Sequence, residues 1–83
     1  MIGNLDQTTI FSHVTAILHQ QIGDEPLSET TDLLNDLGIE SLELVELGVK
    51  MEKAFLITIP IGELRSCVTI EDIVQLIQQR KNM

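Results

Sequence analysis

Apolar side chains recur at helical spacing in three separate segments of the chain. In the first segment, Asp6 or Thr8 can cap the start of a helix, because each has a short side chain with an oxygen acceptor. Gly23 and Pro26 predict that this helix ends near residue 22. The stripe that it would bury contains Ile10, Val14, Ile17 and Leu18, with Phe11 and Ile22 at its edges.

The second segment, residues 41–55, has two apolar stripes instead of one. At about 100° per residue, one stripe contains Leu44, Leu47, Met51 and Phe55, with Gly48 and Ala54 at its edges. The other lies nearly opposite and contains Leu42, Val45 and Val49. A surface helix normally buries a single stripe, so the second either packs beneath the preceding loop or faces a ligand or partner. The sector between them is polar, and the spacing of Glu46 and Lys50 within it predicts a weak surface ion pair.

The third segment opens at Thr69, which predicts the last helix. Thr69 and Asp72 have the spacing of a capping box, with Asp in place of the usual Glu, and Arg80 and Lys81 suit the C-terminal end of a helix dipole. Its apolar stripe contains Ile70, Ile73, Val74 and Ile77. Before it, residues 56–60 could pass for a short strand but have no second strand to pair with, and residues 63–67 predict a short helix.

A long connection, residues 23–40, joins the first two helices. Five apolar residues are expected to hold it against the core: Leu27, Leu33, Leu34, Leu37 and Ile39. Thr30, Thr31 or Asp32 can start a single helical turn inside it, and a glycine, Gly38, frees the backbone close to residue 41. We therefore predict one all-α domain, residues 1–83. It is a small four-helix bundle with three principal helices, a short third helix and a long loop between helices 1 and 2.

The distribution of charge says more than its total. The chain has 83 residues and a formal net charge of −8, and residues 1–49 contain nine acidic residues but no Lys or Arg. This acidic part argues against nucleic acid and against anionic membrane surfaces, and it favours protein partners with basic patches. No stretch approaches the roughly 20 apolar residues of a membrane helix. Cys67 is the one cysteine and cannot build a disulfide framework, which fits a reducing compartment, so we expect a cytoplasmic protein. We expect Cys67 in the core as a small hydrophobic residue, and the protein to be a monomer.

Ser41 is the candidate for chemistry, within the stretch DLGIESLELVEL of residues 36–47. A nucleophilic serine needs a positioned base and an oxyanion hole, and the sequence has no G-x-S-x-G elbow. The two histidines, His13 and His19, lie in the first helical segment and are too few and too far apart to suggest a metal site. The residues therefore predict neither a self-contained enzyme nor a metal centre.

The same stretch resembles the attachment motif of acyl carrier proteins, usually written D-L-G-x-D-S-L. The resemblance continues through Phe55, the Ile59-Pro60 pair and the T-x-x-D-x-V/I pattern at Thr69. It implies the carrier fold and a role for Ser41: a separate phosphopantetheinyl transferase would esterify its hydroxyl to 4′-phosphopantetheine. The thiol of that group would carry acyl intermediates as thioesters between enzymes of fatty acid, polyketide or related lipid synthesis.

The resemblance also implies a docking surface. Three apolar residues, Leu42, Val45 and Val49, lie where carrier proteins contact partner enzymes. Four carboxylates would meet basic residues of the transferase and of acyl-transferring and synthase enzymes: Asp36, Glu40, Glu43 and Glu46. From the residues alone, packing of the apolar stripe under the loop stays open as the alternative.

The chain departs from the family pattern at two places. Glu40 stands where the motif has Asp, and Glu caps a helix less well, which costs about 0.5–1 kcal/mol. Lys50 and Lys53 interrupt a helix that is acidic in carriers of fatty acid synthesis, which suggests a carrier for a dedicated pathway. Two alternatives stay open: a carrier for an amino or aryl acid, and an unmodified helical interaction module.

Overall fold

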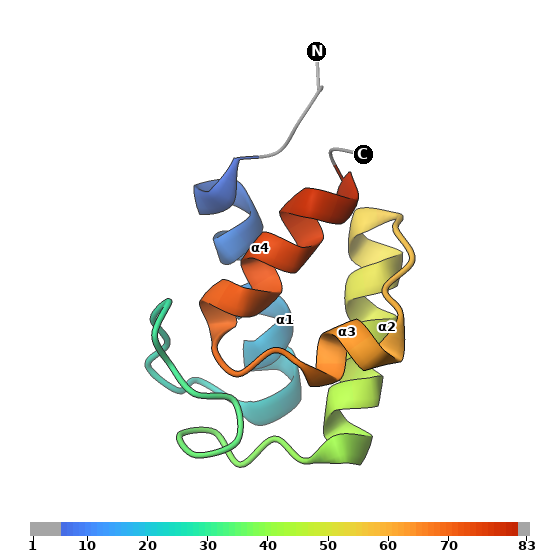
Figure 1. Ribbon diagram of the computed structural model, residues 1–83. Coiled ribbons are helices and arrows are strands. Elements are labelled where there is room, and N and C mark those ends of the chain that lie inside the picture. Colours follow the sequence, from blue (N-terminus) through green and yellow to red (C-terminus); the bar gives the residue numbers. More distant parts are fainter. Residues whose placement is uncertain (1–5, 82–83) are drawn as a thin grey trace.

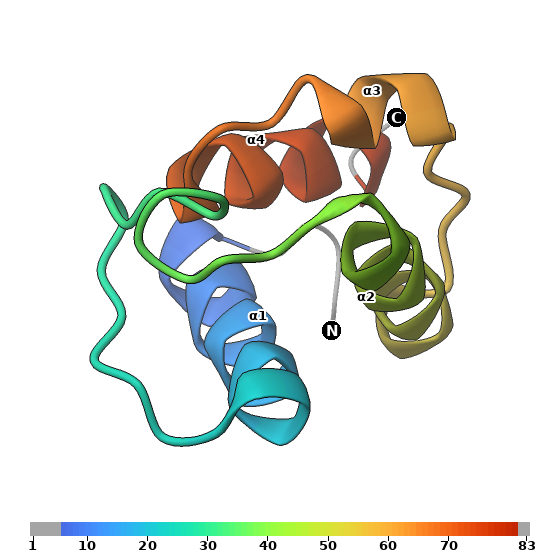
Figure 2. The ribbon, with the colours of Figure 1, turned by 90° about the horizontal axis from the view of Figure 1, so that it is seen from below.

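The computed structural model describes residues 6–81, which contain four α-helices (Figure 1). In chain order they are α1 (Gln7–Ile22), α2 (Ser41–Phe55), α3 (Ile61–Arg65) and α4 (Ile70–Lys81). Helix α1 packs against α4 and α2, and the short α3 packs against α2 and α4 (Figures 1 and 2). The predicted all-α bundle, with a short third helix and a long first loop, is confirmed. No helix within these residues is long and apolar enough to cross a membrane.

The principal helices begin with the caps that the sequence predicts. Asp6 Oδ1 accepts a hydrogen bond from the Thr9 amide at 2.8 Å, and this bond lowers the pKa of Asp6. At α4 the capping box is complete: Asp72 Oδ2 accepts from the amides of Val68 (2.8 Å) and Thr69 (3.1 Å), and Thr69 Oγ1 accepts from the Asp72 amide. Hydrogen bonds from these two amides also lower the pKa of Asp72.

The core consists of the stripes that the periodicity predicts. Its fully buried side chains come from all four helices: Ile10, Val14, Leu18, Leu47, Met51, Leu64, Ile70, Ile73 and Ile77. Ala54, predicted at the edge of the α2 stripe, is exposed, whereas Ile17 and Leu44, predicted within their stripes, are partly buried against the core. Helices α2 and α3 approach closely at Gly48, where an added Cβ would lie 2.6 Å from Leu64 Cδ2.

The long loop is held against the core by four of its predicted anchors. Leu33 and Ile39 are buried, and Leu27 and Leu37 are partly buried against the core. Its turn starts at Asp32, whose Oδ1 accepts from the amides of Leu34 (3.0 Å) and Asn35 (2.7 Å). That turn places Leu34 on its outer side, 59 % exposed, so the prediction that Leu34 anchors the loop was wrong. Backbone bonds fasten the loop to the α3–α4 connection: Leu33 N donates to Val68 O (2.9 Å) and Ile70 N to Thr31 O (3.1 Å).

Helix α3 begins two residues earlier than predicted and ends at Arg65, before Cys67. The carbonyl oxygen of Pro60 accepts from the amides of Glu63 (3.0 Å) and Leu64 (3.1 Å), which starts the helix directly after the proline. Residues 56–60 form no strand; they lead from α2, which ends at the left-handed residue Leu56, to α3.

Candidate functional site

Ser41 is the first residue of α2 and is exposed to solvent. Its hydroxyl makes no hydrogen bond to another residue in the described range 6–81. The backbone before it is fixed, because Ile39 is buried and its amide donates to Leu33 O at 2.9 Å. Gly38 has φ 67°, so the bend before Ile39 uses the left-handed conformation that glycine adopts without strain. A held backbone therefore presents a free hydroxyl.

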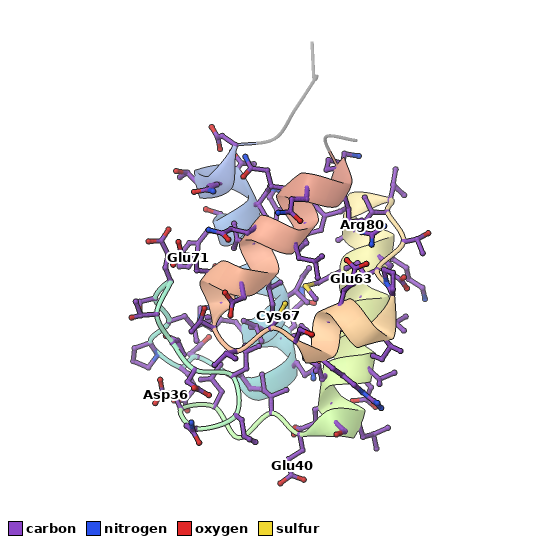
Figure 3. The ribbon with its side chains drawn as sticks, viewed as in Figure 1. Asp36, Glu40, Glu63, Cys67, Glu71 and Arg80 are labelled. Atoms are coloured by element: carbon purple, nitrogen blue, oxygen red, sulfur yellow. The ribbon has the colours of Figure 1, made fainter. Side chains whose placement is uncertain are left out.

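Glu40 occupies the N-cap position of α2 with extended backbone. Glu43 Oε1 accepts from the Glu40 amide at 3.2 Å, which forms one half of a capping box. The Glu40 side chain faces the Glu43 backbone amide in return, which is the other half of the box. Figure 3 shows the Glu40 side chain pointing away from the body of the molecule at the start of α2. A capping box therefore forms at the start of α2 with Glu at the position where the family motif has Asp.

An open groove of about 1000 Å³ lies beside Ser41. The start of α2, the turn after Asp32 and the α3–α4 connection together line it. Three exposed apolar side chains contribute to that lining: Leu34, Leu42 and Val68. The motif did not indicate the contribution of Arg65, Cys67 and Val68, which are more than 20 positions away in the sequence. Only the packing of α3 against α2 brings them to Ser41.

Cys67 also lines this groove and is half-buried, partly against the core as expected. Figure 3 shows it between α3 and α4. Burial, with the carboxylates of Asp72 and Glu63 as further causes, raises the pKa of the Cys67 thiol to about 11. At neutral pH this thiol stays protonated, and a protonated thiol is a poor nucleophile.

The second apolar stripe of α2 faces solvent. Leu42 is 72 % exposed, Val45 38 % and Val49 44 %, so the stripe does not pack under the loop. On the same helix Glu46 is exposed and Glu43 half-buried. Val45 and Val49 line a shallow hollow together with Glu46, Lys50 and Lys53.

Two predicted charged residues have internal contacts. Asp36 Oδ2 accepts from the Asp32 amide at 2.8 Å, so this exposed carboxylate also holds the turn of the loop (Figure 3). The predicted Glu46–Lys50 ion pair was wrong: Lys50 Nζ instead donates to Gln21 Oε1 on α1 at 3.2 Å. The ion pair within residues 6–81 joins Glu63 of α3 to Arg80 of α4 (Figure 3).

Ser41 has no hydrogen-bonded base within residues 6–81. His19 Nε2 is bonded to Glu25 O at 2.9 Å, and the His13 ring lies edge-on to Phe55 with 5.7 Å between ring centroids. In the same range no cluster of three His, Cys, Asp or Glu side chains could hold a metal ion. Neither histidine is therefore bonded to the Ser41 hydroxyl.

Comparison with known proteins assigns the family. Residues 10–77 match the family model described as a phosphopantetheine attachment site. The chain is 35 % identical over 79 residues to an acyl carrier protein of Borreliella burgdorferi, covering 93 % of this chain and 99 % of that protein. The chain belongs to the acyl carrier protein family.

Two further acyl carrier proteins support this assignment. That of Thermotoga maritima is 33 % identical over 73 residues, covering 86 % of this chain and 90 % of that protein. That of Guillardia theta is 33 % identical over 78 residues, covering 92 % and 96 %. Acyl carrier proteins are carriers and not catalysts, and they interact with transferase and synthase enzymes. Covalent 4′-phosphopantetheine is the cofactor that the family match implies, as predicted.

Proposed function

We propose that this protein is a discrete acyl carrier and that Ser41 is its attachment residue. The observation that carries the proposal is the exposed Ser41 hydroxyl, which has no hydrogen bond to the described residues and stands at the first position of α2. In the transfer, Ser41 Oγ forms a bond to the β-phosphorus of coenzyme A. The bond from phosphorus to adenosine 3′,5′-bisphosphate breaks, and a base of the transferase takes the hydroxyl proton.

The surroundings of Ser41 fit the group. The free amides and positive dipole end at the start of a helix suit a phosphodiester. The groove beside Ser41, with Leu34, Leu42 and Val68 in its lining, offers apolar surface to the arm. When attached, the arm supplies a thiol that holds an acyl group as a thioester.

The proposed docking surface for enzymes is the exposed face at the start of α2 and in the loop before it. It consists of Asp36, Glu40, Leu42, Glu43, Val45, Glu46 and Val49. Three exposed apolar side chains, Leu42, Val45 and Val49, support this assignment because a soluble helix normally buries such residues. The surrounding carboxylates would attract basic patches on the transferase and on synthase enzymes. Because exposed ion pairs are individually weak, these contacts would be transient and sensitive to salt.

The pathway that we propose is a dedicated one, such as polyketide or other specialised lipid synthesis, and the protein would act as a cytoplasmic monomer. The dedicated pathway is supported by Lys50 and Lys53, because both are exposed and interrupt the acidic face of α2. Competitive loading with fatty acid synthase enzymes tests it. We expect these enzymes to turn over this protein less efficiently than a carrier of fatty acid synthesis. Equal turnover of the two carriers would refute the dedicated pathway.

The attachment itself is tested by intact mass spectrometry. The protein is incubated with coenzyme A, Mg²⁺ and a broad-specificity phosphopantetheinyl transferase. A phosphopantetheine adduct is expected for the wild type and for Ser12→Ala, which removes another exposed serine on α1, but not for Ser41→Ala. Absence of the adduct with several transferases, including one from the source organism, would leave the unmodified interaction module as the function.

A further inference from the structure

The charge on the exposed face of α2 changes sign along the helix. Glu43 and Glu46 lie in its first half, and Lys50 and Lys53 lie in its second half. The remaining acid of the helix, Glu52, is turned elsewhere, because its Oε2 accepts from the Ile59 amide at 2.8 Å. The exposed face therefore has an anionic and a cationic end.

The two lysines differ in freedom. Lys50 Nζ donates to Gln21 Oε1 at 3.2 Å, and Gln21 Nε2 donates to Glu43 O at 2.9 Å. Both bonds fix the Gln21 amide and hold Lys50 toward α1. Lys53, in contrast, is exposed and has no partner within residues 6–81, and the same is true of the Glu46 carboxylate. Glu46 and Lys53 are therefore free to pair with a partner protein.

Glu46 and Lys53 lie on one line along the helix. They are seven residues apart, which is about 10 Å along the axis and about 20° around it. Val45 and Val49 line the shallow hollow between them. The surface thus offers an apolar floor with one free anion and one free cation at a defined spacing.

We propose that Lys53 determines partner specificity and that the enzyme docking on α2 pairs a basic side chain with Glu46 and a carboxylate with Lys53. This inference rests on the proposed carrier function. A uniformly basic patch would place a like charge against Lys53, which weakens association, whereas a patch of mixed charge satisfies both ends. The charge pattern of α2 therefore selects for partners with an acidic residue about 10 Å beyond the basic one.

The test uses a phosphopantetheinyl transferase with a uniformly basic docking patch as the probe, and measures kcat/KM for modification of Ser41. Lys53→Glu is expected to raise kcat/KM about two- to fivefold at low salt, with a smaller rise for Lys53→Gln, as for an exposed charge contact. The gain should shrink at high salt. Gln79→Glu on α4 is the matched control. It makes the net charge more negative by one unit, as Lys53→Gln does, but at an exposed position on another helix.

A second arm maps the contact. Each Lys or Arg of the probe's patch is changed to Glu in turn, and each variant is measured against the wild-type carrier and Lys53→Glu. For at least one such transferase variant, kcat/KM should be about two- to fivefold higher with the wild-type carrier than with the Lys53→Glu carrier. Equal effects of Lys53→Gln and Gln79→Glu, or no effect of either Lys53 variant, would overturn the inference but leave the carrier function intact. Failure of the wild type to be modified at all would overturn both.

Discussion

Replacing Gly48 by alanine tests how closely α3 packs on α2. Two effects oppose each other. Alanine is better than glycine in a helix interior by about 1 kcal/mol. However, its Cβ would lie 2.6 Å from Leu64 Cδ2, where ordinary contacts are 3.4–4 Å. Leu64 is only 1 % exposed, so its side chain cannot move aside into solvent.

The overlap should outweigh the helix preference. Overpacking of a closed core costs about 1–3 kcal/mol, so the net change for Gly48→Ala is a loss of about 0–2 kcal/mol in the free energy of unfolding. Leu64→Ala alone should cost about 2–5 kcal/mol through the cavity that it leaves. In the double variant the new methyl group occupies part of that cavity. The double variant should therefore lose about 1–3 kcal/mol less than the sum of the two single losses.

Urea unfolding followed by far-ultraviolet circular dichroism measures these changes, since the chain has no Trp or Tyr to report by fluorescence. Gly62→Ala in α3 is the control, because nothing lies within 4 Å of its added Cβ and only the helix preference acts there. The close packing of the two helices would be refuted if Gly48→Ala raised the free energy of unfolding as much as Gly62→Ala does. The effects of Gly48→Ala and Leu64→Ala would then also be additive.

Three further predictions concern the caps and the thiol. The Asp72 carboxylate, whose folded pKa is lowered, contributes stability above its unfolded pKa of about 3.9 and loses it as pH falls through the folded value. Asp72→Asn should therefore weaken the fall of urea stability below pH 4, and an unchanged pH profile would contradict this. Glu40→Asp should stabilise the protein by up to about 1 kcal/mol and speed modification of Ser41; loss of stability would show that Glu40 is the better cap here. Because the pKa of Cys67 is raised to about 11, its alkylation by iodoacetamide at pH 8 should be roughly tenfold or more slower than that of a free thiol. Equal rates by intact mass would contradict the burial of this thiol.

Local rules predicted much of the fold. Capping residues such as Asp6 and Asp72 act within one turn of the chain, so the sequence alone indicates where α1 and α4 begin. Periodicity likewise identified which positions of α2 form the core stripe, because side-chain direction repeats with the helix turn. The prediction that Ser41 is the attachment residue likewise needs only consecutive residues, because the motif lies within the stretch of residues 36–47.

Contacts between distant segments decided the rest. The solvent exposure of Leu34 follows from the turn that Asp32 caps and from the way the loop is fastened to residues 68–70. Gln21 of α1 holds Lys50, so the expected pair with Glu46 does not form, and Lys53 is the α2 cation that has no side-chain partner within residues 6–81. The groove beside Ser41 exists because Gly48 lets α3 pack closely on α2 and bring Cys67 and Val68 to the same place. A pattern along one helix states which side chains share a face, but only the neighbouring helices determine which face meets water.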